Sequence, residues 1–388
     1  MNPLNPIFAL TVFSLAFGTA YLLNSKYKIV INNNRYETID GIRGFLAISV
    51  FIHHATIWFH YLHTNSWEAP KSNLYNQLGQ TSVSLFFMIT SFLFVSKLLN
   101  EGTQTTNWKD FFIGRIFRLV PLYLVSIILL IFIVMICTHW KLNVSIIDFL
   151  KQLTHWGTFT MYDAPKINHC EFTNIINASV IWSLPYEWLF YFSLPLLYII
   201  INRKKTSISF SIISLLFIVV FYRFHGILKP HIMSFIGGAI APFLIKYKPK
   251  KINFNSVFLS ITLLLSLGLI LRYNSSDNIL CKMFIIIAFN LIALGNNLFG
   301  LLKNTTLKFL GELSYSTYLL HGILIFCVMY FCVGLTDAKT LTATNYCLIL
   351  IGITPLVVII SFLTYLFIEK PGMNYGKKLR IKNNTSNI

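Results

Sequence analysis

Long apolar runs separated by short polar connections constrain this chain more than any other feature. About eleven runs are long enough, or nearly long enough, to cross a hydrocarbon core about 30 Å thick. They cover approximately residues 6–23, 42–62, 80–99, 116–137, 180–201, 207–222, 230–246, 254–272, 278–299, 312–333 and 345–368. Lipid satisfies no backbone hydrogen bond, so runs of this kind form helices. We therefore expect an all-α polytopic membrane protein with about eleven transmembrane helices.

The composition agrees with this class. Only 11% of the residues are charged, against about 25% in soluble domains, and the mean hydropathy is +0.66. The net charge of +18 predicts basic inner loops and contact with anionic membrane lipids. A basic inner surface also favours an anionic cofactor. Because the charges are scattered between apolar runs and form no basic stripe, we expect no nucleic-acid partner.

The loop charges indicate an orientation. With the runs above taken as spans, 22 of the 31 Lys and Arg residues fall in one set of connections. The positive-inside rule assigns those connections to the cytoplasm. The N-terminus is then predicted outside the membrane and the C-terminus in the cytoplasm. No Cys-x-x-Cys spacing occurs, so we expect no metal site.

Two ionisable residues lie on one face of the second run. Arg43 and His54 are eleven positions apart, which is three helical turns plus about 20°. Their separation along the helix axis is about 16 Å, with Arg43 at the membrane surface and His54 deep inside. A buried ionisable side chain is costly in a bilayer, which makes His54 a candidate functional residue.

Glu187 is predicted at the same depth as His54, about 10 Å into the fifth run. A carboxylate beside an imidazole fixes its tautomer and stabilises the imidazolium, as a general base requires. The alternative is that Glu187 bonds another polar group of the bundle. Both interpretations stay open at this point.

Arginines gather at the predicted inner ends of the helices. Arg43, Arg115 and Arg118 are of this kind, and Arg115 and Arg118 share a helical face. The guanidinium fork suits a phosphate group. Ordinary positive-inside anchoring is the alternative.

Further along the chain, His321 lies in the tenth run, where a structural role is favoured. Pro371, directly after Glu369 and Lys370, is predicted to end the last helix.

The longest connection covers residues 138–179 and is predicted outside the membrane. It contains aromatic, acidic and imidazole side chains, namely His139, Trp140, His155, Trp156, Asp163, His169 and Glu171. Long loops of this type are often functional. Aromatic rings with carboxylates and amides suit a sugar-binding surface, whereas an interfacial aromatic belt explains the same residues equally well.

With these residues assembled, the chain resembles the acyltransferase-3 family of membrane O-acyltransferases over about residues 36–372. The motifs that carry the likeness are Asp40-Gly41-Ile42-Arg43-Gly44 through His54, Leu85-Phe86-Phe87 with Phe92-Leu93, Phe111 through Pro121 with Arg115 and Arg118, Trp182-Ser183-Leu184 with Glu187, Phe190-Tyr191 and Pro195, Leu310-Gly311 through Ser314-Tyr315 and Tyr318-Leu319 to His321, and Glu369-Lys370-Pro371. Six motifs in the family's order make this a specific resemblance.

The resemblance implies transfer of an acetyl group from acetyl-CoA, as cosubstrate, to a hydroxyl of a sugar or similar acceptor. It implies His54 as the catalytic base. His54 would deprotonate the acceptor hydroxyl or else briefly carry the acetyl group, and Glu187 would orient it; the sequence does not separate the two roles of His54. Arg43 would help to position the donor, with Arg115 and Arg118 on the CoA phosphates. Supporting residues in the matching motifs are Asp40, Ser183, Tyr315, His321 and Glu369.

The expected organisation has three parts. Residues 1–35 form an additional N-terminal helix and an inner linker, residues 36–372 form the ten-helix acyltransferase-like domain, and residues 373–388 form a basic cytoplasmic tail. The chain resembles the stand-alone type, without an esterase-like domain.

The leading hypothesis is a bacterial inner-membrane O-acetyltransferase, of the class that transfers groups other than aminoacyl groups. Its acceptor would be an envelope or exported glycan, such as the O-antigen of lipopolysaccharide or an exopolysaccharide, free or lipid-linked. The alternatives are a transporter or flippase for a lipid-linked glycan, which also uses charges inside the membrane, and an acyltransferase for a small molecule. The sequence does not decide the oligomeric state.

Overall fold

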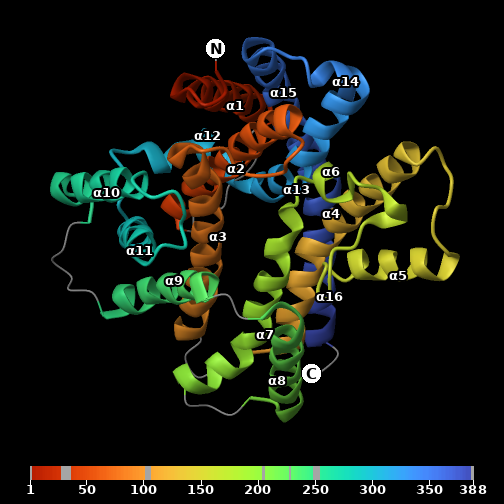
Figure 1. Ribbon diagram of the computed structural model, residues 1–388. Coiled ribbons are helices and arrows are strands. Elements are labelled where there is room, and N and C mark those ends of the chain that lie inside the picture. Colours follow the sequence, from red (N-terminus) through yellow and green to blue (C-terminus); the bar gives the residue numbers. More distant parts are fainter. Residues whose placement is uncertain are drawn as a thin grey trace. The chain divides into compact units, whose positions relative to one another are not determined.

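Helices form at every predicted apolar run in the computed structural model, which describes residues 2–27, 36–100, 106–202, 206–226, 229–247 and 254–385 (Figure 1). No strand occurs among these residues. The helices at the runs are α1 (Pro6–Tyr27), α2 (Glu37–Thr64), α3 (Asn73–Asn100), α4 (Trp108–Cys137), α7 (Ser183–Asn202), α8 (Ile208–His225), α9 (Lys229–Tyr247), α10 (Val257–Ile270), α11 (Ile279–Ala293), α13 (Ser314–Cys327) and α15 (Ala343–Thr364).

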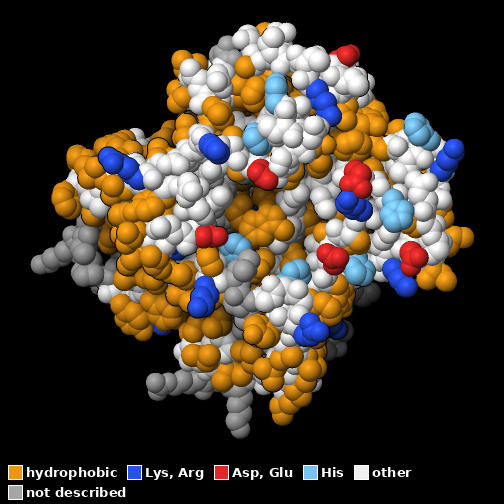
Figure 2. Space-filling view, viewed as in Figure 1, with side chains coloured by type: hydrophobic (Ala, Val, Ile, Leu, Met, Phe, Trp, Pro, Cys, Tyr) orange, Lys and Arg blue, Asp and Glu red, His pale blue; other side chains and the backbone are white. Residues whose placement is uncertain are grey.

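The membrane class is supported by helix length and by surface composition. Within the described ranges, eight helices are long and apolar enough to cross a membrane, whereas α10 and α11 are shorter. The all-α polytopic fold is therefore confirmed, and the number eleven stays a prediction. Hydrophobic side chains are widely exposed on the surface (Figure 2), including Ile208 of α8 and Phe258 of α10, which are 77% and 75% exposed. Apolar exposure of this extent marks a surface that contacts lipid.

The chain divides into two compact units. The first comprises Met1–Ser96 and Leu228–Ile359, and the second comprises Lys97–Ile227 and Ile360–Ile388. Basic residues of the predicted inner connections, such as Lys28, Arg35, Arg203 and Lys250, lie outside the described residues.

In the first unit, glycines let α2 approach η3 (Leu301–Lys303) and α12 (Thr305–Glu312) closely. A Cβ atom on Gly41 would lie 1.9 Å from the carbonyl oxygen of Leu302, and one on Gly311 would lie 2.1 Å from the carbonyl oxygen of Asp40. Small residues permit this kind of helix contact in membrane proteins. The glycines of the Asp40–Gly44 motif therefore position the start of α2.

The second unit is built on α4, α7, α8 and α16 (Lys370–Thr385), with α16 packed against α4. The prediction that Pro371 ends the last helix is wrong. The π-helix η5 (Tyr365–Glu369) leads directly from α15 into α16. Pro371 lies inside one continuous helical stretch, Ala343–Ile381, directly after the π-helical segment, where the backbone hydrogen-bond register changes and a proline is accommodated.

The connection from α4 to α7 includes four short helical segments. It contains α5 (Ile146–Gly157), η1 (Ile167–His169), α6 (Thr173–Ile176) and η2 (Val180–Trp182). Buried Asn168 joins its parts, because its Nδ2 donates to Thr138 Oγ1 (3.0 Å) and to the carbonyl oxygen of Lys141 (2.7 Å). Trp156 is buried and its Nε1 donates to the carbonyl oxygen of Pro165, so this ring packs the connection. Trp140 is 62% exposed.

Candidate active site

Arg43 is held near the start of α2 by two polar partners. Its Nη2 donates to Ser314 Oγ at 3.0 Å, and its Nη1 lies 3.7 Å from Asp40 Oδ1. Both charged side chains are largely buried, which strengthens their interaction relative to a surface pair. The supporting residue Asp40 therefore fixes the guanidinium predicted to position the donor.

Deeper along α2, His54 meets His321 of α13. His321 Nε2 lies 3.0 Å from His54 Nδ1, and the ring centroids are 5.0 Å apart. His321 is completely buried. The sequence indicated a buried histidine in each run but not that the two would touch. The signal in the sequence was that each histidine is an ionisable residue deep inside an apolar run. Each also lies in one of the motifs that carry the family resemblance.

The hydrogen-bond pattern assigns the protons of this pair. His321 Nδ1 lies 2.8 Å from the carbonyl oxygen of Thr317, which only accepts, so Nδ1 carries the proton. In the neutral ring, His321 Nε2 is then an acceptor. His54 Nδ1 lies 3.0 Å from this nitrogen and 3.0 Å from the carbonyl oxygen of Val50, so it carries a proton that both accept. The lone pair of His54 is consequently on Nε2.

The neighbouring His53 has a different environment. Its Nδ1 contacts the carbonyl oxygen of Tyr75 at 2.8 Å, and its ring packs on Gly79, where a Cβ atom would lie 2.3 Å from His53 Cδ2. These contacts tie α2 to α3. His53 is therefore a packing residue.

Glu187 bonds within the second unit. The Tyr191 hydroxyl donates to Glu187 Oε1, and the Arg115 guanidinium lies 6.0 Å from the centroid of the Tyr191 ring. This contact agrees with the alternative interpretation, in which Glu187 bonds another polar group of the bundle. His54 and Glu187 belong to separate units, so their pairing stays a prediction.

The other predicted residues lie as follows. Arg118 Nη1 donates to Met373 Sδ of α16 at 3.1 Å, and Arg380 of α16 packs beside Gly114 of α4. Basic groups thus gather along the contact of α4 with α16. Supporting residues are also internal: Ser183 Oγ donates to the carbonyl oxygen of Val180 at 3.4 Å, and Glu369 is completely buried in η5. Tyr315 is half-buried in α13.

Lys282 of α11 is a buried cation that the sequence interpretation did not single out. Its Nζ donates to Ser84 Oγ (2.8 Å) and Ser234 Oγ (3.2 Å), and the residue is 1% exposed. A lysine inside an apolar run was the signal for it. Its two serine partners come from α3 and α9, so Lys282 cross-links three helices.

Comparisons with known proteins show which protein family and which relatives this chain is similar to. A family model described as an acyltransferase domain matches residues 36–366. Curated relatives from strains COL, MSSA476 and MRSA252 of Staphylococcus aureus, each named "Putative O-acetyltransferase", are 24% identical over 383 residues. The matched region covers 88% of this chain and only 58% of each relative. No solved structure gave a significant match.

Proposed function

This chain belongs to the acyltransferase-3 family of membrane O-acyltransferases, and from that premise we propose that it moves an acetyl group from cytoplasmic acetyl-CoA to a hydroxyl of an envelope or exported glycan. The observation that carries the proposal is the contact of His54 Nδ1 with His321 Nε2 at 3.0 Å. It leaves His54 Nε2 unprotonated, as a general base must be. The proposed setting is the bacterial inner membrane, with the N-terminus outside and the C-terminus in the cytoplasm.

The proposed reaction is a direct transfer. His54 Nε2 takes the proton of the acceptor hydroxyl while the acceptor oxygen attacks the carbonyl carbon of the acetyl thioester. The new ester C–O bond forms and the C–S bond breaks. The CoA thiolate leaves and receives the proton held on His54, so the enzyme returns to its starting state.

His321 acts on this step through His54. When His54 becomes an imidazolium, its Nδ1–H donates to His321 Nε2 and to the carbonyl oxygen of Val50. Hydrogen bonds of this kind strengthen when the donor is charged. Thr317 in turn holds the His321 tautomer. His321 is therefore the positioning residue of the proposed base.

On the donor side, the proposal gives Arg43 the task of orienting acetyl-CoA, with Arg115 and Arg118 toward its phosphates. The support is the guanidinium chemistry and the basic connections that the positive-inside rule assigns to the cytoplasm. On the acceptor side, the connection of residues 138–179 is proposed to face the glycan. Its support is a set of exposed polar and aromatic side chains in that segment, namely His139, Trp140, Asp163, His169 and Glu171.

The test is the acetylation of surface polysaccharide in cells. Deletion, wild-type and His54→Ala strains are compared by mass and proton NMR of the purified polysaccharide. His63→Ala is the matched control, since His63 is an exposed histidine in the last turn of the same helix. Loss of a base-labile acetyl group in the deletion and His54→Ala strains, and not in the control, supports the proposal.

Other outcomes separate the alternatives. An unchanged acetyl pattern with less glycan at the cell surface would instead indicate a transporter or flippase. No change in either quantity would direct the search to small-molecule acceptors and would overturn the glycan assignment. Expression of every variant in the membrane fraction is measured in parallel, so that loss of protein is not taken for loss of activity.

A further inference from the structure

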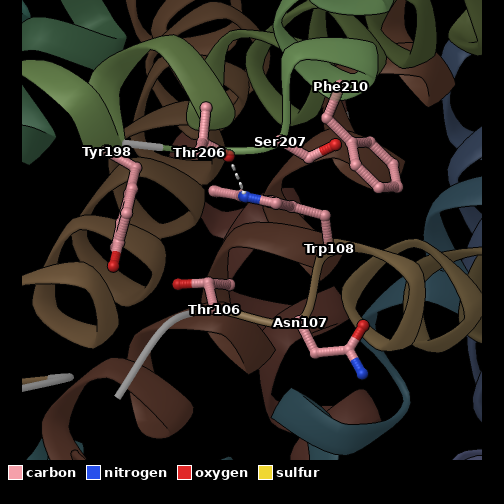
Figure 3. Close-up of a pocket in the computed structure, with 7 residues that line it drawn as sticks. All are labelled: Thr106, Asn107, Trp108, Tyr198, Thr206, Ser207 and Phe210. Carbon is pink, nitrogen blue, oxygen red and sulfur yellow. Dashed lines mark hydrogen bonds between the residues drawn. The ribbon is translucent and has the colours of Figure 1, made fainter. Parts of the chain in front are cut away.

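An aromatic pocket of about 350 Å³ lies at the N-terminal end of α4, against α7 and α8 (Figure 3). Trp108, Tyr198 and Phe210 contribute its rings, and Thr206 and Ser207 contribute hydroxyl groups. The Trp108 indole Nε1 donates to Thr206 Oγ1 at 2.6 Å, and the Trp108 and Tyr198 ring centroids are 5.8 Å apart. The pocket therefore combines flat apolar faces with hydrogen-bonding groups, all from one structural unit.

Tyr198 shows that the pocket suits a polar ligand. The residue is 2% exposed, and its hydroxyl has no hydrogen-bond partner among the described residues. A buried hydroxyl without a partner costs free energy that the remainder of the fold must offset. A ligand that bonds this hydroxyl recovers that cost. A purely packing role for the pocket leaves the buried hydroxyl unexplained.

The helix faces of α4 and α7 that line the pocket also carry Arg115 and Tyr191, one step further along each helix. Trp108 and Arg115 are seven residues apart, so they share a helical face and are separated by about 10 Å along the axis. Tyr198 and Tyr191 have the same spacing on α7. Phe111 links the two positions, with its ring centroid 5.9 Å from that of Trp108 and 6.0 Å from that of Tyr191.

We propose that this pocket binds the nucleobase of the acyl donor, with the donor phosphates directed toward Arg115. The inference rests on the proposed function, which supplies acetyl-CoA as the donor. Aromatic side chains bind a base by stacking, and the ring nitrogens and exocyclic amine of adenine can bond hydroxyls such as that of Tyr198. The spacing from Trp108 to Arg115 is comparable with that between the base and the phosphates of a nucleotide.

The test compares two donors that carry the same thioester, acetyl-CoA and S-acetylpantetheine, of which only the first has a nucleotide. Purified full-length protein in liposomes is assayed with each donor. For Trp108→Leu, we expect the ratio of kcat/KM for acetyl-CoA to kcat/KM for S-acetylpantetheine to fall about tenfold. For Tyr198→Phe, which removes one hydrogen bond, the expected fall is about fivefold.

Tyr222→Phe is the matched control, because Tyr222 is 63% exposed on α8 and lies outside the pocket. Thermal unfolding of Tyr198→Phe is measured as well. This variant removes a hydroxyl that has no partner in the protein, so its Tm should equal or exceed that of the wild type. If Tyr198 had a purely structural role, Tyr198→Phe would not lower the ratio of kcat/KM values for the two donors while leaving Tm unchanged.

Binding of adenosine 3′,5′-bisphosphate to each protein, measured by calorimetry, gives a readout independent of transfer. The variants should bind this probe more weakly than the wild type and the control. Unchanged donor ratios together with unchanged probe binding overturn the pocket assignment while leaving the proposed function intact. Absence of acetyl transfer from either donor by the wild type overturns the proposed function instead.

Discussion

Replacing His321 by phenylalanine removes one of the two acceptors of His54 Nδ1–H, leaving the carbonyl oxygen of Val50, while keeping an aromatic ring of similar size. The affected contact is the 3.0 Å separation of His54 Nδ1 from His321 Nε2. A hydrogen bond to a charged group contributes about 1.5–3 kcal/mol. Because the charge on His54 develops only as it takes the proton, this amount is lost from the transition state. The expected fall in kcat is therefore about 10- to 150-fold.

The assay is acetyl transfer by the purified protein in liposomes, with kcat and KM measured separately at saturating acceptor. KM for acetyl-CoA should change little, since His321 contacts neither the donor nor Arg43 in the proposed mechanism. His321→Gln is the conservative variant, because its amide can accept from His54 and donate to the carbonyl oxygen of Thr317. It should recover most of the lost kcat.

The reasoning is refuted if His321→Phe retains kcat within about threefold of the wild type. It is also refuted if His321→Gln is as impaired as His321→Phe, since the two variants differ in the hydrogen bonds they can make. A fall in Tm that accounts for the lost activity would show that His321 acts on folding alone.

Two further predictions concern stability. Gly311→Ala places a Cβ atom 2.1 Å from the carbonyl oxygen of Asp40, so we expect a loss of about 1–3 kcal/mol and a lower Tm. The control Gly18→Ala lies inside α1 and meets nothing within 4 Å, so its Tm should be equal to or slightly above that of the wild type. Lys282→Met replaces a buried ammonium group whose two serine partners each keep another hydrogen bond, so thermal unfolding should show equal or higher stability, by up to about 4 kcal/mol. A large fall in Tm for Lys282→Met would mean that the cation itself holds α3, α9 and α11 together.

The helices and their apolar character were predictable because a span must be long and apolar to satisfy its backbone in lipid. The shared face of Arg43 and His54 followed from helical periodicity alone. The predicted end of the last helix was wrong because the helix continues past Pro371, which follows the π-helical segment η5. Residue spacing alone could not show that a π-helical segment would precede this proline.

Contacts between segments that are far apart in the sequence could not be predicted, for a different reason. His54 and His321 are separated by 267 positions, and their meeting depends on how α2 packs against α12 and α13. The α2–α12 contact has Gly44 and Gly311 at close approach. Helix propensity disfavours glycine inside a helix, so only the tertiary contact explains these two residues. The bond from Tyr191 to Glu187 is local on α7, but which of several polar groups Glu187 would contact was not fixed by spacing.

The most direct measurement of the central claim is the stoichiometry of acetyl transfer by the purified protein. Labelled acetyl-CoA is supplied to liposomes containing the wild type, His54→Ala or His63→Ala, and both free CoA and acetylated acceptor are quantified. We expect one acetyl ester per CoA released for the wild type and His63→Ala, and a loss of at least about 100-fold for His54→Ala. Transfer by His54→Ala at the wild-type rate would contradict the assignment of His54 as the base.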